Sequence, residues 1–399
     1  GKAAVPQGGV SSGSWRVRRG ELQQSRLGRG GSVSLSTALR NMPAAVTARQ
    51  TCGACLLELE LGYNGLGPDD GVGWGEWMAG SVAMESPIGL RLLSLHDNPL
   101  GESGGMGLAA GLGLSPPLLC LALSDCRLGD GAGSALASAL TRNTRLRVLD
   151  LEGNKLGPAS ALALGEALGQ QIVRGQQQPG GLDKLILSGN RLGDTGVSSL
   201  AGALSRAQAA VAKARSADSN PSDEGASSGA ALSQDVQNAA AAPYRGLSSL
   251  LLRSVEMGAC GAHAIGTAII APATNPLPGD DLSGRRPTAS QERRVSVCSV
   301  TELDLSENAF GREGAAALLM RLRIRGLMLG LGRLAHCDPH GGGRLAVTLQ
   351  GCEMPQQLCT DITAALRPFG GGGASQGHQA SGSGMQVHDT AVLLSGSVD

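Results

Sequence analysis

The chain has 399 residues, and its 33 Lys and Arg residues balance its 33 Asp and Glu residues, so its formal net charge is zero. Nucleic-acid binding normally needs an excess of basic side chains that displace counterions from the phosphate backbone, and this balance argues against it. Aromatic residues make up 2% of the chain, which is few for a globular core of this length. The composition therefore favours a core that is filled by aliphatic side chains.

The chain opens with a segment, residues 1–16, in which no repeating pattern is found. It begins with Gly1 rather than Met, which leaves open whether this N-terminal segment is truncated. No basic stretch followed by an apolar stretch is present, so the sequence predicts no secretory signal here.

From residue 17 onward one hydrophobic pattern recurs, and it is clearest in the stretch LRVLDLEGNKLGPASALALGEAL. Leu149 and Leu151 are two residues apart, so on an extended strand they point to the same face. Later in the stretch, Leu164 and Leu168 have the spacing of one helix face. The Asn and Gly residues between the two halves suit a tight turn. The unit is thus predicted to be a strand, a turn and a helix.

Nine copies of this unit align on the residue that ends the strand-and-turn half. Their starts are residues 17, 56, 90, 118, 146, 182, 247, 300 and 344. In all nine copies, the residues eight and twelve positions after the last apolar residue of the turn (Leu156 in the stretch above) are also apolar. The alignment rests on the strand-and-turn half alone, so the helical half supports it independently. Neither half can bury its apolar face by itself, so the copies must stack on one another.

The pattern LxxLxLxxNxLGxxGxxxLxxAL resembles the leucine-rich repeats of the ribonuclease-inhibitor type, and similar repeats occur in NOD-like receptors and Ran GTPase-activating proteins. This resemblance implies an α/β solenoid over residues 17–366, a horseshoe with parallel strands on its concave face and helices on its convex face. The consensus Asn is expected to satisfy backbone groups of the turn. It is present at Asn64, Asn98, Asn154, Asn190 and Asn308, is replaced by Cys126 and Cys352, an accepted variant, and is lost at Ser25 and Val255, where looser turns are expected.

The run Met106–Leu123 contains 18 uncharged residues, which is at the edge of the length needed to span a membrane. It also holds three Gly and two Pro residues, and it covers the helix of one repeat and the strand of the next. We therefore expect a buried part of the solenoid and no membrane partner.

Two low-complexity insertions and a tail interrupt or follow the repeats. Residues 205–246 are rich in Ala, Ser and Gln, and only their opening, Ser205–Arg215, has the character of a helix extension. Residues 270–299 hold Pro, Asp and Arg, and residues 367–399 form a Gly/Ser-rich tail. Segments with so few large apolar residues are predicted to be disordered.

The second insertion carries two short basic motifs of the kind that Arg-directed kinases accept. Arg293 and Arg294 precede Ser296, and Arg285 and Arg286 precede Thr288. A phosphate at either position would add about −1.5 to −2 charges close to the arginines. The sequence thus predicts two phosphorylation sites.

The nine cysteines show no disulfide framework, which favours a reducing compartment, so we expect a cytoplasmic protein with the nucleus as the alternative. Cys52 and Cys55 form a CxxC pair without a second pair to complete a metal site. A loose group, His336, Cys337, His340, Cys352 and Cys359, includes one cysteine that the repeat already uses. The Gly-rich stretches lack the Lys-Ser/Thr of a phosphate-binding loop. The sequence predicts no metal and no cofactor.

No set of nucleophile, base and orienting group is recognisable, so the sequence predicts no catalytic residues and no enzyme. We expect a non-enzymatic module that binds a partner protein on the concave face, where acidic residues outnumber basic ones and a partner with a basic or amphipathic face would fit. The candidate binding residues are Glu58, Glu60, His96, Asp150, Glu152, Lys184, Ile186, Leu251, Arg253, Glu302 and Asp304. The alternative is a regulator of a small GTPase, similar to Ran-type GTPase-activating proteins, although the long acidic tail of that family is missing. Oligomeric state and partner identity are left open.

Overall fold

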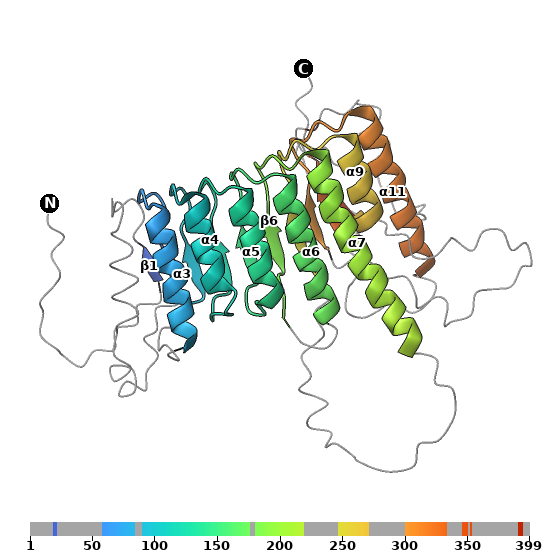
Figure 1. Ribbon diagram of the computed structural model, residues 1–399. Coiled ribbons are helices and arrows are strands. Elements are labelled where there is room, and N and C mark those ends of the chain that lie inside the picture. The colour runs from blue at the N-terminus through green and yellow to red at the C-terminus, as the bar shows by residue number, and fades with distance from the viewer. Residues whose placement is uncertain are drawn as a thin grey trace, which may run out of the picture.

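The computed structural model describes residues 19–21, 58–83, 90–175, 180–218, 246–270, 300–332, 345–349, 352 and 390–393. In these residues short strands alternate with helices, and Figure 1 shows the helices standing side by side along one face of the sheet. The strands are β1 (Arg19–Glu21), β2 (Glu58–Glu60), β3 (Leu92–Ser94), β4 (Cys120–Ala122), β5 (Val148–Asp150), β6 (Lys184–Ile186), β7 (Ser249–Leu251), β8 (Glu302–Asp304), β9 (Leu345–Thr348) and β10 (Thr390–Leu393). The helices are α3 (Pro68–Ala83), α4 (Gly101–Leu112), α5 (Asp130–Arg142), α6 (Pro158–Arg174), α7 (Gly193–Asp218), α9 (Ala259–Ile265), the π-helix η1 (Gly266–Ile270) and α11 (Gly311–Gly332).

The ten strands form one parallel sheet in which the spatial order is the sequence order. The register keeps equivalent positions opposite one another, so Leu121 pairs with Leu149 and Leu149 pairs with Leu185. Each repeat therefore pairs with the repeat before it and the repeat after it, as a solenoid requires. The predicted α/β leucine-rich-repeat solenoid is confirmed.

The structure describes only a few residues of the predicted insertions and tail. Helix α7 continues to Asp218, so the opening of the insertion 205–246 is helical. Strand β10 lies within the segment 367–399 and pairs with β9. The other residues of that segment, and residues 219–245 and 271–299, lie outside the described part of the chain.

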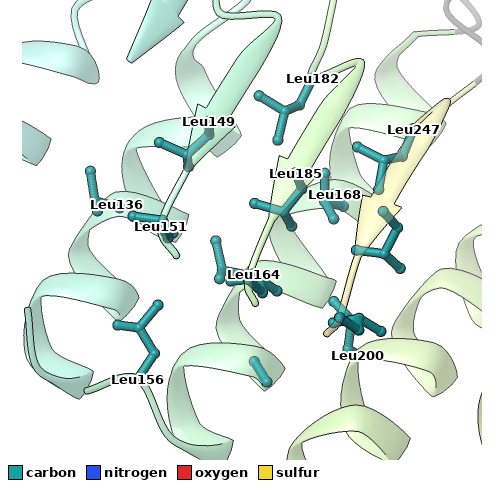
Figure 2. Close-up of a cluster of buried hydrophobic side chains, with 14 of the residues drawn as sticks. Leu136, Leu149, Leu151, Leu156, Leu164, Leu168, Leu182, Leu185, Leu200 and Leu247 are labelled. Atoms are coloured by element: carbon teal, nitrogen blue, oxygen red, sulfur yellow. The ribbon is translucent and has the colours of Figure 1, made fainter. Parts of the chain in front are cut away.

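The core is formed by leucines that each repeat places at the same positions (Figure 2). In strands β2 to β8 the middle residue points toward the helices and is almost completely buried, as at Leu149 and Leu185. The helices supply the two apolar positions that the sequence predicts, and in all seven described repeats both are at most 2% exposed. These pairs are Trp74/Met78, Leu108/Leu112, Leu136/Leu140, Leu164/Leu168, Leu200/Leu204, Ile265/Ile269 and Leu318/Leu322. Burial of one such side chain contributes about 2 kcal/mol, so the repeated leucines are the main source of stability.

The run Met106–Leu123 is divided between α4 and β4, as the sequence predicts. Its glycines let α3 and α4 approach closely. A Cβ atom on Gly75 would lie 2.0 Å from the carbonyl oxygen of Gly107, and one on Gly111 would lie 2.1 Å from that of Gly75. The absence of side chains at these positions therefore serves helix packing. No helix in the described part of the chain is long and apolar enough to cross a membrane.

A row of buried asparagines joins the turns of neighbouring repeats. The Asn154 amide nitrogen donates to three backbone carbonyl oxygens, those of Leu123, Leu151 and Glu152, at 2.8 to 3.1 Å. Its side-chain oxygen accepts hydrogen bonds from the backbone amides of Cys126 and Leu128 at 3.1 and 2.9 Å. One side chain thus satisfies five backbone groups, which belong to two repeats. Asn98, Asn190 and Asn308 make corresponding bonds.

The cysteines that replace Asn fill only part of this role. The Cys126 thiol donates to the carbonyl oxygens of Leu95 and Ser124 at 3.1 and 3.4 Å. The Leu100 amide, whose counterparts bond to Asn, bonds instead to the carbonyl oxygen of Asn98. Cys352 likewise donates to the Leu305 carbonyl oxygen. The prediction that these cysteines occupy the Asn position is confirmed.

Replacement of Asn154 by Ala should lower the free energy of unfolding by at least about 3 kcal/mol, because several buried backbone groups lose their partner at about 1–3 kcal/mol each. Asn154→Cys should lie between wild type and Ala, since Cys126 fills the equivalent position. Lys155→Ala, at the exposed neighbouring residue, should stay within about 0.5 kcal/mol. Urea unfolding followed by circular dichroism measures all three. Similar losses for Asn154→Ala and Lys155→Ala would contradict the role of the asparagine.

A second contact between repeats caps the helices. Gly157, at the start of α6, has no side chain to satisfy the free amides of the first turn. Asp130 of the preceding helix does so: its Oδ1 accepts from the amides of Gly157 and Ser160 at 2.8 and 3.1 Å and from the Ser160 hydroxyl at 2.5 Å. Asp194 caps α9 in the same way through the amide of Gly258 at 2.7 Å. The negative charge also interacts favourably with the positive end of the helix dipole.

These bonds give Asp130 a pH-dependent effect on stability. Burial raises the pKa of Asp130, but the hydrogen bonds from Ser160 and Gly157 outweigh it, so the pKa lies below its ordinary value. The carboxylate form is therefore favoured in the folded chain, and its contribution is present above about pH 4 and is lost as the pH falls through the lower folded pKa. Asp130→Asn should have a lower urea midpoint than wild type at neutral pH, and the gap should narrow toward about pH 3. A gap that does not change with pH would exclude this effect.

Candidate functional site

The face of the sheet that is opposite the helices, called the open face from here on, is the predicted concave face. On strands β2 to β8 the residues before and after the buried middle residue point to this face. In the central strands many of them are small or apolar and partly exposed. They form an apolar band that consists of Leu92, Cys120, Ala122, Val148, Ile186 and Leu251.

The predicted binding residues all lie in the described part of the chain, and all lie at the open face. Eight are outward strand residues: Glu58, Glu60, Asp150, Lys184, Ile186, Leu251, Glu302 and Asp304. Three follow a strand by two residues, at the equivalent position of three repeats: His96, Glu152 and Arg253. The predicted phosphorylation sites Thr288 and Ser296 lie outside the described residues.

Carboxylates gather at the carboxyl ends of β3, β4 and β5. The backbone amide of Asp97 bonds to the carbonyl oxygen of Ser124, and that of Asp125 bonds to the carbonyl oxygen of Glu152, both at 2.9 Å. Asp150 lies two residues before Glu152, and its Oδ1 accepts the Glu152 amide at 3.0 Å. Three consecutive repeats thus bring four carboxylates together, and we call Asp97, Asp125, Asp150 and Glu152 the carboxylate cluster.

Burial and neighbouring carboxylates disfavour the charged form of three members of the carboxylate cluster. Burial raises the pKa of Asp150, and Asp125 adds to this effect. Burial raises the pKa of Glu152, with further contributions from Asp150 and Asp125. The pKa of Asp125 is raised by burial and then by Asp97, while His96 acts in the opposite direction. The charged form of each of these three groups is therefore less favourable here than in water.

The two basic side chains among the predicted binding residues are held by other acids. Lys184 Nζ lies 3.5 Å from Glu302 Oε2, and Ser249 donates to the same oxygen at 2.5 Å. Arg253 pairs with Glu307. Within the described residues, no cation lies at ion-pair distance from Asp125, Asp150 or Glu152. No ion pair within the described residues therefore neutralises these three carboxylates.

An aromatic pair borders the carboxylate cluster. The Tyr63 and His96 rings meet edge to face with centroids 5.2 Å apart, and the Tyr63 hydroxyl bonds to Asp97, which raises the pKa of the tyrosine. Ser94 Oγ and His96 Nδ1 are 2.7 Å apart, which orients the imidazole. Gly62 leaves room for this ring, since a Cβ atom there would lie 2.2 Å from it.

Tyr63, Asp97, Asp125 and Glu307 were missed among the predicted binding residues, yet the sequence holds a signal for them. Each directly precedes the Asn or Cys of its turn. The residue at this position has a φ between 51° and 68° in every described repeat from β2 to β8, namely Tyr63, Asp97, Asp125, Gly153, Gly189, Ser254 and Glu307. Gly and Asp suit this left-handed conformation, whereas Tyr, Ser and Glu seldom adopt it.

Metal and redox sites find no support within the described residues, where no group of His, Cys, Asp and Glu is arranged to hold a metal ion. Cys52, Cys55, His336, Cys337, His340 and Cys359 lie outside these residues. Cys126 is buried at its turn, and burial raises the pKa of its thiol to about 12, so it is a poor nucleophile.

Comparison with known families agrees with this architecture. Four segments match the model for a leucine-rich repeat: residues 115–137, 142–165, 182–201 and 298–319. They include strands β4, β5, β6 and β8. A search of curated proteins gave no match. Repeats of this kind generally serve as binding scaffolds for other proteins.

The raised pKa values predict that the carboxylate cluster lowers stability at neutral pH. A carboxyl whose folded pKa is raised favours the folded chain below its ordinary pKa, and this contribution is lost as the pH rises through the folded pKa. Asp150→Asn and Glu152→Gln should therefore raise the urea midpoint at neutral pH, and the gain should shrink toward about pH 4. Glu166→Gln, on the exposed side of α6, serves as the control and should change little. Lower midpoints for both cluster variants would refute the repulsion.

Proposed function

The chain carries leucine-rich repeats in an α/β solenoid, and from this premise we propose that it is a non-enzymatic module whose open face binds a partner protein. The observation that carries the proposal is the face of the parallel sheet that no helix of the described residues covers. Parallel sheets are normally covered on both faces, but in the described part of the chain the helices line one face only (Figure 1). The apolar band on the other face is partly exposed and suits burial by a second protein.

The composition of the open face supports a protein as its ligand. Apolar side chains run across several strands, and charged side chains flank them, which is the arrangement of a protein interface with an apolar centre and a polar rim. The backbone groups of the strands are already paired within the sheet, so recognition falls to side chains. Stacked repeats give such a surface a large area.

The test is an affinity capture with the full chain as bait. A variant with Ile186→Arg and Leu251→Arg places two charges on the apolar band, and Leu162→Arg, which replaces an exposed leucine of α6, is the matched control. We expect proteins that wild type and the control capture equally and the double variant captures about tenfold less, the scale of an interface hot spot. Mass spectrometry identifies them, and circular dichroism verifies that all three baits are folded. If capture is the same with both variants, the open face is not the binding surface.

The alternative function is regulation of a small GTPase, and its support is the resemblance of the repeats to those of Ran-type GTPase-activating proteins. Such a regulator would act through polar residues on a rim of the solenoid, and we assign no residue of this chain to that role. An assay with a panel of small GTPases separates the two functions, because only the alternative expects faster GTP hydrolysis. We further propose an intracellular, cytoplasmic or nuclear location, since Cys120, Cys126 and Cys260 are free thiols.

A further inference from the structure

The charge of the open face indicates which kind of protein fits it. The basic side chains Lys184 and Arg253 are held by Glu302 and Glu307, whereas the carboxylate cluster has no cation at ion-pair distance among the described residues. An approaching surface therefore meets negative charge next to apolar side chains. Nucleic acids and anionic membranes would be repelled, and a basic protein segment would be attracted.

The position of the carboxylate cluster suits a long cationic side chain. The cluster lies at the carboxyl ends of the same strands, β4 and β5, that supply Cys120, Ala122 and Val148 to the apolar band. The aliphatic stem of a Lys or Arg can lie along apolar surface while its charged end reaches a carboxylate. Both halves of such a side chain thus find a fitting environment within two adjacent strands.

The aromatic pair adds a second feature that suits a cation. Tyr63 is 51% exposed, although it lies in a chain with only 2% aromatic residues. Its φ of 57° is unusual for an aromatic residue, and its hydroxyl bonds to Asp97 of the carboxylate cluster. A guanidinium or ammonium group is attracted to the face of an aromatic ring as well as to a carboxylate. Tyr63 therefore extends the cation-binding character of this region to the neighbouring repeat.

The carboxylate cluster also lowers the cost of binding a cation. Asp150 is partly buried, Asp125 and Glu152 are exposed next to it, and the charged forms of all three are disfavoured in the free protein. A cation from a partner would relieve this repulsion, and the relief would add to the favourable free energy of binding. Surface carboxylates that already have internal partners, such as Glu302, lack this advantage.

We propose that the partner of the open face is a protein with a basic segment, in which a Lys or Arg side chain enters the carboxylate cluster beside Tyr63 and neighbouring apolar side chains cover the band. This inference rests on the proposed function, because it names the class of partner for the same face. The centre of the contact lies on the repeats of β3 to β6. Lys184 and Arg253 remain in their ion pairs with Glu302 and Glu307.

The direct test uses a short fluorescent peptide in which Arg alternates with Val, and a matched peptide in which Glu replaces Arg. Fluorescence anisotropy with the full chain should show binding of the Arg peptide, weakened by added salt, and no comparable binding of the Glu peptide. The double variant Asp125→Asn, Glu152→Gln should raise the Kd of the Arg peptide about tenfold, because two carboxylates that attract the cation lose their charge. Tyr63→Leu should also raise it. Glu166→Gln, which removes a carboxylate from the helix side, should leave it unchanged.

Each contrary result overturns the inference. Failure of the Arg peptide to bind, equal binding of the Glu peptide, or an equal loss for Glu166→Gln would exclude recognition of a basic segment by the carboxylate cluster. Loss of folding cannot imitate the expected result, because removal of charge from Glu152 should stabilise the chain, and urea unfolding verifies this. Proteins captured through the apolar band but insensitive to Asp125→Asn, Glu152→Gln would overturn this inference alone. Capture that is insensitive to Ile186→Arg, Leu251→Arg would overturn the proposed function itself.

Discussion

The solenoid depends on satisfying the backbone of its tight turns. Each turn after a strand is buried between two repeats, and a buried amide or carbonyl without a partner costs about 1–3 kcal/mol. Asn154 satisfies five such groups, three of them in the repeat before it. Because the acceptors and donors lie in two repeats, the same side chain that closes a turn also fixes the distance between neighbours.

Stacking at this fixed distance also determines how the core, the helix caps and the helix contacts form. It aligns the leucines of consecutive strands in register, so a continuous core forms mainly from leucine side chains (Figure 2). It places Asp130 of one helix at the start of the next, which caps a helix that begins with glycine. It also sets how closely the helices approach, which requires Gly75 and Gly107 where α3 meets α4.

The open face is free of these constraints, because its side chains take no part in the core. Its composition can therefore follow binding rather than stability. The carboxylate cluster illustrates the difference, since burial and neighbouring carboxylates raise the pKa of Asp125, Asp150 and Glu152, whereas Asp130, which serves the stack, has a lowered pKa. Tyr63 is a further example, as an exposed aromatic residue in a left-handed turn. Such departures from the most stable choice are common at functional sites.

The sequence alone determined the repeat, the strand and helix faces and the residues of the core, because periods of two and 3.6 residues are local properties of the chain. It also placed Asp150 and Glu152 on the outer face, by alternation from Leu149 and Leu151. Only the tertiary structure decided which of these side chains meet. Lys184 pairs with Glu302, which lies 118 residues away and beyond both insertions, and the carboxylate cluster draws on three repeats. Contacts of this kind depend on the stacking distance and on the direction of each turn, and neither is written in the hydrophobic pattern of a single repeat.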